Sequence, residues 1–129
     1  MHLPVPSFAD LDDRIARKLV SRVDQGPISI YNYTEACTYN HAWDDVTRAA
    51  RGLVLNRDTG EVVARAFDKF FNLGDERNGG PLPERAPDVV TVKYDGSLGI
   101  LYRHEGRIRW TTRGSFYSPQ AAVAERIWA

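Results

Sequence analysis

The sequence predicts an α+β domain in which helices flank a mostly antiparallel sheet. Three observations lead to this prediction: an amphipathic helical pattern near the start, six short runs rich in β-branched and aromatic residues, and a second helix signature at the end. The chain has 129 residues, of which 43% are hydrophobic and 26% are charged. These values are typical of one globular domain with a modest core.

The first element is predicted to be a helix over residues 8–22. Ser7 is a suitable N-cap with Asp10 three residues later, and apolar side chains follow at helical spacing, at Phe8, Leu11, Ile15 and Leu19. The pair Gly26-Pro27 should end this element. We therefore treat residues 1–27 as an N-terminal helical segment and expect the sheet to begin after it.

In the middle of the chain, the sequence predicts a strand, a short polar stretch and a hairpin. ISIYNYT, from Ile28, has the composition of a strand, and NHAWDDVTRAA fits a loop or a short helix. RGLVLN and EVVARAF are two strands joined by RDTG, which predicts a hairpin over residues 51–67. The run DKFFNLGDERNGGPLPERAPD contains three prolines and reads as a long connection.

The last third predicts three more strands and a final helix. TVKYD, LGILYRH and RIRWTT are the strands, and Glu105-Gly106 joins the last two tightly. Ser118 is a candidate cap and Pro119 suits the first position of the final helix. This helix stops without a C-cap glycine, so we expect the chain to be cut at its C-terminus.

Composition and charge exclude several classes of protein. The formal net charge is zero, so the chain as a whole is not an electrostatic nucleic-acid binder, although residues 90–129 carry six positive against three negative side chains, an excess of +3. No apolar run approaches the ~18 residues of a membrane span, and the start lacks a signal peptide, which together predict a cytoplasmic protein.

The cysteine and histidine content argues against a disulfide bond and against a structural metal site. Cys37 stands alone, so no internal disulfide is possible, and a buried, inert thiol is favoured over a nucleophile. His2, His41 and His104 are scattered without the spacing of metal ligands, which argues against a structural zinc site.

Lys93 is the main candidate for chemistry, because it interrupts an apolar β-branched run and is followed by Asp95, Gly96 and Ser97. An amine attacks phosphorus only in its neutral form, which burial on a strand and nearby cations favour. Gly96 permits close approach to a ligand or an unusual dihedral, and Asp95 can bond local amides or orient the amine. The pattern suits covalent nucleotidyl transfer, while a plain hairpin turn with an edge lysine remains the alternative.

Four blocks together carry a resemblance: RGLVLN, KFFNLGD, K-x-D-G-S-L and TTRGSFYSPQA. In this order they resemble the ATP-dependent RNA ligases of the bacteriophage RNA ligase 1 type, within the covalent nucleotidyltransferase superfamily. The resemblance implies a partial nucleotidyltransferase (ATP-grasp-like ligase) domain, with residues 28–129 as the N-terminal part of an adenylyltransferase domain. Leu98 stands where DNA ligases and capping enzymes carry an arginine, which favours the RNA ligase branch.

The resemblance also implies roles for particular residues. Lys93 would be the nucleophile that takes AMP from ATP, and the ATP phosphates would be bound by Arg51, Lys69 and Arg113. Supporting positions would be Tyr31, Phe71, Asp95, Gly96, Ser97, Gly114 and Ser115. Tyr33 competes with Tyr31 for its role, and core packing is an equal alternative for Phe70 and Phe71. Arg113 replaces a lysine of the phage enzyme, which keeps the charge but changes its geometry.

The resemblance implies ATP and Mg²⁺ as cofactors, with no metal ligand within this chain. The implied partners are RNA ends, which include those of cleaved tRNA, and a missing C-terminal segment or partner chain. The later motifs of the family find no place in 129 residues, so we expect the isolated chain to adenylylate itself weakly or not at all. Two alternatives stay open: a non-catalytic nucleotide- or RNA-binding module, and a purely structural α+β fragment.

Overall fold

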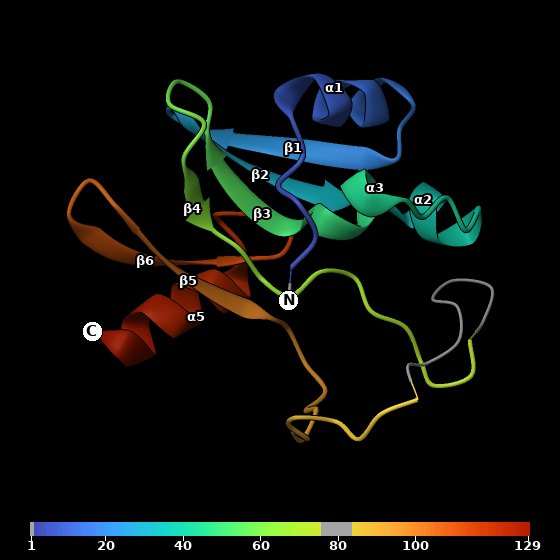
Figure 1. Ribbon diagram of the computed structural model, residues 1–129. Coiled ribbons are helices and arrows are strands. Elements are labelled where there is room, and N and C mark those ends of the chain that lie inside the picture. Colours follow the sequence, from blue (N-terminus) through green and yellow to red (C-terminus); the bar gives the residue numbers. More distant parts are fainter. Residues whose placement is uncertain (1, 76–83) are drawn as a thin grey trace.

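The computed structural model describes residues 2–75 and 84–129. It contains a four-stranded antiparallel sheet in the order β1-β2-β3-β4 and a separate two-stranded sheet, β5-β6 (Figure 1). The strands are β1 (Val20–Gln25), β2 (Ile28–Tyr33), β3 (Arg51–Asn56), β4 (Val62–Ala64), β5 (Gly99–His104) and β6 (Arg107–Thr112). The helices are α1 (Phe8–Ala16), α2 (Glu35–Tyr39), α3 (Asp45–Ala49) and α5 (Pro119–Trp128). The predicted α+β class, with antiparallel sheets and flanking helices, is confirmed.

The two faces of the four-stranded sheet are covered by different elements (Figure 1). The face toward α1 and α3 buries one apolar cluster, which consists of Leu11, Val20, Tyr31, Ala50, Leu53 and Leu55. The face toward the β5-β6 hairpin buries a second, which consists of Ile28, Ile30, Val54, Ala64, Ile100, Tyr102 and Phe116. Helix α5 packs against β6 on the outer side of this hairpin. The elements therefore stack in four layers: α1 with α3, the four-stranded sheet, the hairpin and α5. None of the described helices is long and apolar enough to cross a membrane.

The predicted helix over residues 8–22 is too long. It begins as expected, with the Ser7 hydroxyl accepting a hydrogen bond from the Asp10 backbone N–H, but it ends at Ala16. Lys18 then adopts a left-handed conformation with φ of 61°, and a right-handed helix cannot continue through a residue in this conformation. Residues 20–25 form β1, which pairs with β2 across a hairpin turn at Gly26-Pro27. The proposed N-terminal helical segment thus includes a strand of the main sheet, because β-branched residues gain more from the ladder than from a helix.

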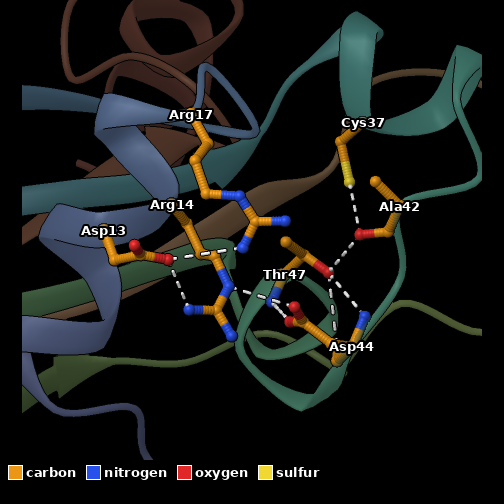
Figure 2. Close-up of polar contacts among 7 residues, drawn as sticks. All are labelled: Asp13, Arg14, Arg17, Cys37, Ala42, Asp44 and Thr47. Carbon is orange, nitrogen blue, oxygen red and sulfur yellow. Dashed lines mark hydrogen bonds and ion pairs between the residues drawn. The ribbon is translucent and has the colours of Figure 1, made fainter.

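Polar contacts lock α1 to the start of α3 (Figure 2). The Arg14 guanidinium donates to the Asp44 carboxylate at 3.0 Å. Asp44 in turn caps α3, accepting from the Thr47 N–H while the Thr47 hydroxyl accepts from the Asp44 N–H. The nearby Cys37 thiol is fully buried and burial raises its pKa, which fits the inert thiol that the sequence favoured. These contacts fix the helix that leads directly into β3.

The predicted hairpins and the final helix are confirmed, although β4 is shorter than expected. The strand expected at residues 91–95 is wrong, because this segment joins neither sheet. Its large apolar side chains, Val92 and Tyr94, are both exposed, so it gains no core contact that would hold it extended. The long connection that precedes it has no helix or strand in its described parts, and residues 76–83 lie outside the described residues.

Gly52 allows β3 to pack closely on the β5-β6 layer. It is the extra residue of a β-bulge, since Tyr31 pairs with Leu53 and Asn32 pairs with Arg51, and its φ is +69°. A Cβ atom at Gly52 would lie 2.5 Å from the Ile100 side chain and 3.2 Å from the Arg113 Cα. Only glycine combines this dihedral with this close approach.

We predict that Gly52→Ala is much more destabilising than Gly60→Ala. Gly60 also has a positive φ, +76°, but nothing lies within 4 Å of a Cβ there. The Gly60 variant should lose about 1 kcal/mol of unfolding free energy from left-handed strain alone, whereas the Gly52 variant should lose about 2–4 kcal/mol because overpacking adds to that strain. Urea unfolding measures both, and equal losses would contradict the close packing.

Candidate active site

A cavity of about 510 Å³ opens where β2, β3 and β6 end beside the segment that carries Lys93. It is lined by Asn32, Arg51, Lys93, Gly96, Ser97, Leu98, Thr112, Arg113 and Gly114. The lining comes from four separate parts of the chain and includes six of the residues predicted for the site. Lys93 therefore lies in one cavity with two of the three basic residues predicted to accompany it.

The sequence predicted that Lys93 would lie on a buried strand. In the structure it reaches the cavity from an exposed segment that is not a strand. Gly96, three residues later, has a φ of +135°, which is the unusual dihedral that glycine was expected to supply. Asp95 is also exposed, and among the described residues no hydrogen bond or ion pair joins it to Lys93. The amine thus lies at the open edge of the cavity.

Arg113 is held at the cavity wall by Tyr33. Its guanidinium donates a short hydrogen bond to the Tyr33 hydroxyl and lies 5.1 Å from the centroid of the same ring. The Tyr33 ring in turn makes an edge contact with Trp43, with ring centroids 5.0 Å apart. Since Arg113 also packs its backbone against Gly52, both its backbone and its head group are fixed.

Tyr31 lies in the core and not at the cavity. Its side chain is 1% exposed and packs with Leu11 and Leu53 on the α1 face of the sheet, where burial raises the pKa of its phenol. The competing residue, Tyr33, is the tyrosine that contacts Arg113. The sequence could not separate the two because YNY offers both within one strand.

Arg51 and Lys69 extend the positive charge to one side of the cavity. The Arg51 guanidinium donates to the Phe67 carbonyl at 3.1 Å and lies 5.5 Å from the Phe70 ring centroid. The Lys69 amine donates to the Phe70 carbonyl at 2.9 Å. Its backbone N–H donates to the Arg48 carbonyl, which ties this segment to α3.

The Lys69 amine is surrounded by aromatic rings and by other cations. It lies 4.8 Å from the Phe71 centroid and 5.5 Å from that of Trp43. Burial lowers the pKa of Lys69 most, and the charges of Arg51 and Arg113 lower it further, while Asp75 acts in the opposite direction. Lys69 is not part of the cavity lining, but it lies in the same electrostatic field.

The remaining predicted residues shape the surroundings. Phe71 belongs to neither core cluster and packs against Trp43, with Arg48 5.5 Å from its centroid, and Phe70 is 50% exposed, so core packing does not explain either ring. The Ser115 carbonyl accepts from the Thr111 hydroxyl at 2.7 Å and closes the loop after β6. Ser118, as predicted, caps α5.

Sequence reasoning missed Asn32, Trp43 and Arg48. Asn32 lines the cavity, Trp43 supports both Tyr33 and Lys69, and Arg48 contacts Phe71. A signal was available for Arg48, because it precedes Arg51 by three residues in a short basic run. Trp43 carried none, since an isolated tryptophan in a polar stretch reads as a surface residue.

The arrangement suits a ligand with several negative charges. The three fixed cations bond to neutral oxygens only, namely those of Tyr33, Phe67 and Phe70, and among the described residues no carboxylate forms an ion pair with them. Seven other described arginines do pair with carboxylates: Arg14, Arg17, Arg22, Arg57, Arg65, Arg85 and Arg109. The fold and the site thus define a protein with a cavity lined by two arginines and a lysine amine and with no carboxylate ion pair to them among the described residues, which is chemistry suited to phosphates.

Comparison with known proteins identifies the family. A family model described as RNA ligase matches residues 49–129, which is more than half of the chain, so the chain belongs to the RNA ligase family. This match contains Arg51, Lys69, Lys93 and Arg113. The resemblance noted in the sequence to RNA ligases is thereby confirmed.

Three curated relatives carry related names. A protein of Autographa californica nuclear polyhedrosis virus named "Putative bifunctional polynucleotide kinase/RNA ligase" is 30% identical over 79% of this chain. A "Putative RNA ligase" of Thermovibrio ammonificans is 36% identical over 62% of the chain, and "RNA ligase 1" of Bacteriophage TS2126 is 35% identical over 56%. The matched regions span 17%, 21% and 20% of these proteins, so this chain corresponds to about a fifth of their length.

We predict that the pKa of Lys69 lies below its ordinary value of 10.5 and rises when either neighbouring arginine is removed. Arg51→Gln and Arg113→Gln should each raise it only in part, because burial is the larger cause. NMR titration of the Lys69 side-chain signals measures the shift. An unchanged value in both variants would show that the three cations do not interact.

The same shift makes the stability of the fold depend on pH. The unfolded chain binds the Lys69 proton more tightly than the folded chain, so unfolding free energy should rise as pH increases through the lowered folded pKa, until about pH 10.5. Lys69→Gln should flatten this rise relative to the parent chain in urea unfolding at a series of pH values. A rise of the same size in both chains would contradict the assignment.

Proposed function

We propose that this chain is the N-terminal part of the adenylyltransferase domain of an ATP-dependent RNA ligase, with residues 28–129 as a partial nucleotidyltransferase fold. One observation carries the proposal: Lys93, Arg51 and Arg113 line one cavity, and all three lie within the region that matches the RNA ligase family. The names of the three relatives support the same reading.

The first step follows from the groups around the cavity. Arg51, Lys69 and Arg113 bind the phosphates of ATP and offset their charge as it shifts during the reaction. The neutral Lys93 amine attacks the α-phosphorus, the bond from that phosphorus to the bridging oxygen of the β-phosphate breaks, and pyrophosphate leaves. The nitrogen gives up a proton, and a phosphoramidate between Lys93 and AMP remains.

The later steps act on RNA ends. An oxygen of an RNA 5′-phosphate attacks the phosphorus of the adduct, the P–N bond breaks, and AMP is transferred to the RNA while the lysine regains its proton. The 3′-hydroxyl of a second end then attacks the RNA phosphorus, AMP leaves, and a phosphodiester forms. RNA with a 5′-phosphate and a 3′-hydroxyl is therefore the proposed substrate, and cleaved tRNA provides ends that can be brought to this state.

Mg²⁺ would be held here mainly by the phosphates of ATP, because the described residues offer no ready-made metal site. No group of three or more acidic, histidine or cysteine side chains lies close enough together there to hold an ion. No acidic residue lines the Lys93 cavity either. The contribution proposed for the described residues is the charge of Arg51, Lys69 and Arg113, and no step above depends on a metal ligand from them.

We predict that Lys93→Ala abolishes AMP attachment while Lys18→Ala does not. The chain has three lysines, and Lys18 is exposed and lies outside the cavity lining, which makes it a matched control. The chain and the complete product of its gene are each incubated with ATP labelled at the α-phosphate and with Mg²⁺. A phosphoramidate is labile in acid and stable in base, so this test distinguishes it from an ester.

The arginines serve as a second test of the same mechanism. Arg51→Gln and Arg113→Gln should each slow adduct formation by on the order of 10²-fold, because each removes charge that stabilises the transition state. Labelling that persists in Lys93→Ala, or no labelling of the complete gene product, would contradict the proposed function.

A non-catalytic binding module is the second candidate, and the exposure of Lys93 favours it. This reading predicts that nucleotide or RNA still binds to Lys93→Ala, with no adduct formed in the parent protein. The labelling experiment therefore separates the two candidates when ATP and RNA affinity are measured alongside it.

A further inference from the structure

A second cavity, of about 460 Å³, adjoins the phosphate site on the side of Lys69. It is lined by His2, Leu3, Arg48, Phe67, Asp68, Lys69 and Phe70. None of these residues lines the cavity of Lys93, and none belongs to a core cluster. Its role is thus separate from both the attack of Lys93 and the packing of the core.

The cavity presents two aromatic rings to solvent. Phe67 is 75% exposed and Phe70 is 50% exposed, although phenylalanine is usually buried. The Phe67 ring already takes a planar partner, since the His2 ring stacks on it at 6.5 Å with an interplanar angle of 25°. Rings held open in this way are suited to stacking against another flat group.

The wall of the cavity is fixed by the N-terminal segment around Leu3, which lies outside the helices and strands. The Leu3 N–H donates to the Asp68 carboxylate at 2.7 Å, and the Arg65 guanidinium donates both to the Leu3 carbonyl and to Asp68. Asp68 is therefore neutralised by Arg65 at 3.0 Å. The charge that remains around the two rings comes from Arg48 and Lys69, and it is positive.

Arg51 connects this cavity to the phosphate site. It lines the Lys93 cavity, donates to the Phe67 carbonyl and lies over the Phe70 ring. A ligand whose phosphate is bound by Arg51 therefore has an aromatic surface directly beside it. Alternating phosphates and flat bases are the features of a single-stranded nucleic acid, and a basic groove with exposed aromatic rings is how proteins bind one.

We propose that the Phe67–Phe70 cavity stacks a nucleobase of the single-stranded RNA end, with the adjoining phosphate on Arg51 and Lys69 once pyrophosphate has left them. The inference rests on the proposed function for the identity of the strand. RNA fits better than the adenine of ATP, because that base is joined through one ribose to the phosphate at Lys93, whereas the two cavities share no lining residue. The positive charge beside the rings favours a polyanion over an apolar protein segment.

The test measures equilibrium binding and does not depend on catalysis. In a Lys93→Ala background, Phe67→Ala combined with Phe70→Ala should weaken binding of a short 5′-phosphorylated oligoadenylate by about 5- to 100-fold, as expected for loss of stacking. Tyr replacements at both positions should preserve affinity. Tyr117→Ala is the matched control, since Tyr117 is 70% exposed and lies outside this cavity.

Two further arms identify what the rings bind. An oligonucleotide with the same phosphates but abasic sugars should bind the parent and the double variant equally, and ATP affinity measured by equilibrium dialysis should be unchanged by the double variant. Melting temperatures confirm that both rings are dispensable for folding.

Unchanged oligoadenylate affinity would overturn the proposal, as would an equal loss for the abasic strand or a loss of ATP affinity. The first result would mean that the rings bind no base, the second that charge or folding was altered, and the third that the base belongs to ATP. Because Lys93 is absent from every arm, a failure to form the AMP adduct would refute the proposed function and leave this test intact.

Discussion

The close contact at Gly52 is the constraint on which the site depends. The four-stranded sheet and the β5-β6 hairpin share no ladder, so they are held together by side-chain packing and by side-chain hydrogen bonds such as that from the Tyr102 hydroxyl to Gln25. At Gly52 the backbone of β3 meets Ile100 and the backbone of Arg113, at a distance that any side chain would prevent. Arg51 is the neighbour of Gly52, so the same contact that joins the layers also brings two arginines from distant parts of the chain into one cavity.

That geometry concentrates charge without neutralising it. Arg51, Lys69 and Arg113 are each held by a neutral oxygen, which fixes the position of the charge and leaves most of it uncompensated. Seven other described arginines have carboxylate partners, as Arg14 has in Asp44. Burial and mutual repulsion are costs to the folded chain, and the lowered pKa of Lys69 reports both. A bound polyphosphate offsets the repulsion, which links the stability of this region to its ligand.

The sequence predicted the local elements better than their partners. The hairpins around RDTG and Glu105-Gly106, and the capped helix from Pro119, depend on neighbouring residues and were all recognisable. Residues 17–22 were not, because Leu19 continues a helical spacing while a left-handed Lys18 starts a strand. The segment around Lys93 has strand composition, yet it forms no ladder with either sheet, and pairing of this kind is not encoded locally.

At the site, too, the sequence predicted the residues better than their positions in the fold. The motif blocks named Arg51, Lys93 and Arg113, and the fold places them around one cavity, but which side of a strand faces that cavity was beyond the motif. Tyr31 and Tyr33 differ by two residues, and the bulge at Gly52 interrupts the register opposite them. Tyr31 packs under α1, whereas the Tyr33 hydroxyl accepts a hydrogen bond from Arg113. A one-residue irregularity in the partner strand thus decides which tyrosine lies at the site.

Lys93 differs from the other cations of the site in how it is held. Arg51 and Arg113 are set on strand ends and bonded in place, whereas Lys93 approaches from an exposed segment outside both sheets. A phosphate group bound to the two arginines carries the negative charge that attracts a third cation to the same place. In the proposed reaction, the two arginines hold the phosphate in line for attack, and Lys93 supplies the amine from the exposed segment.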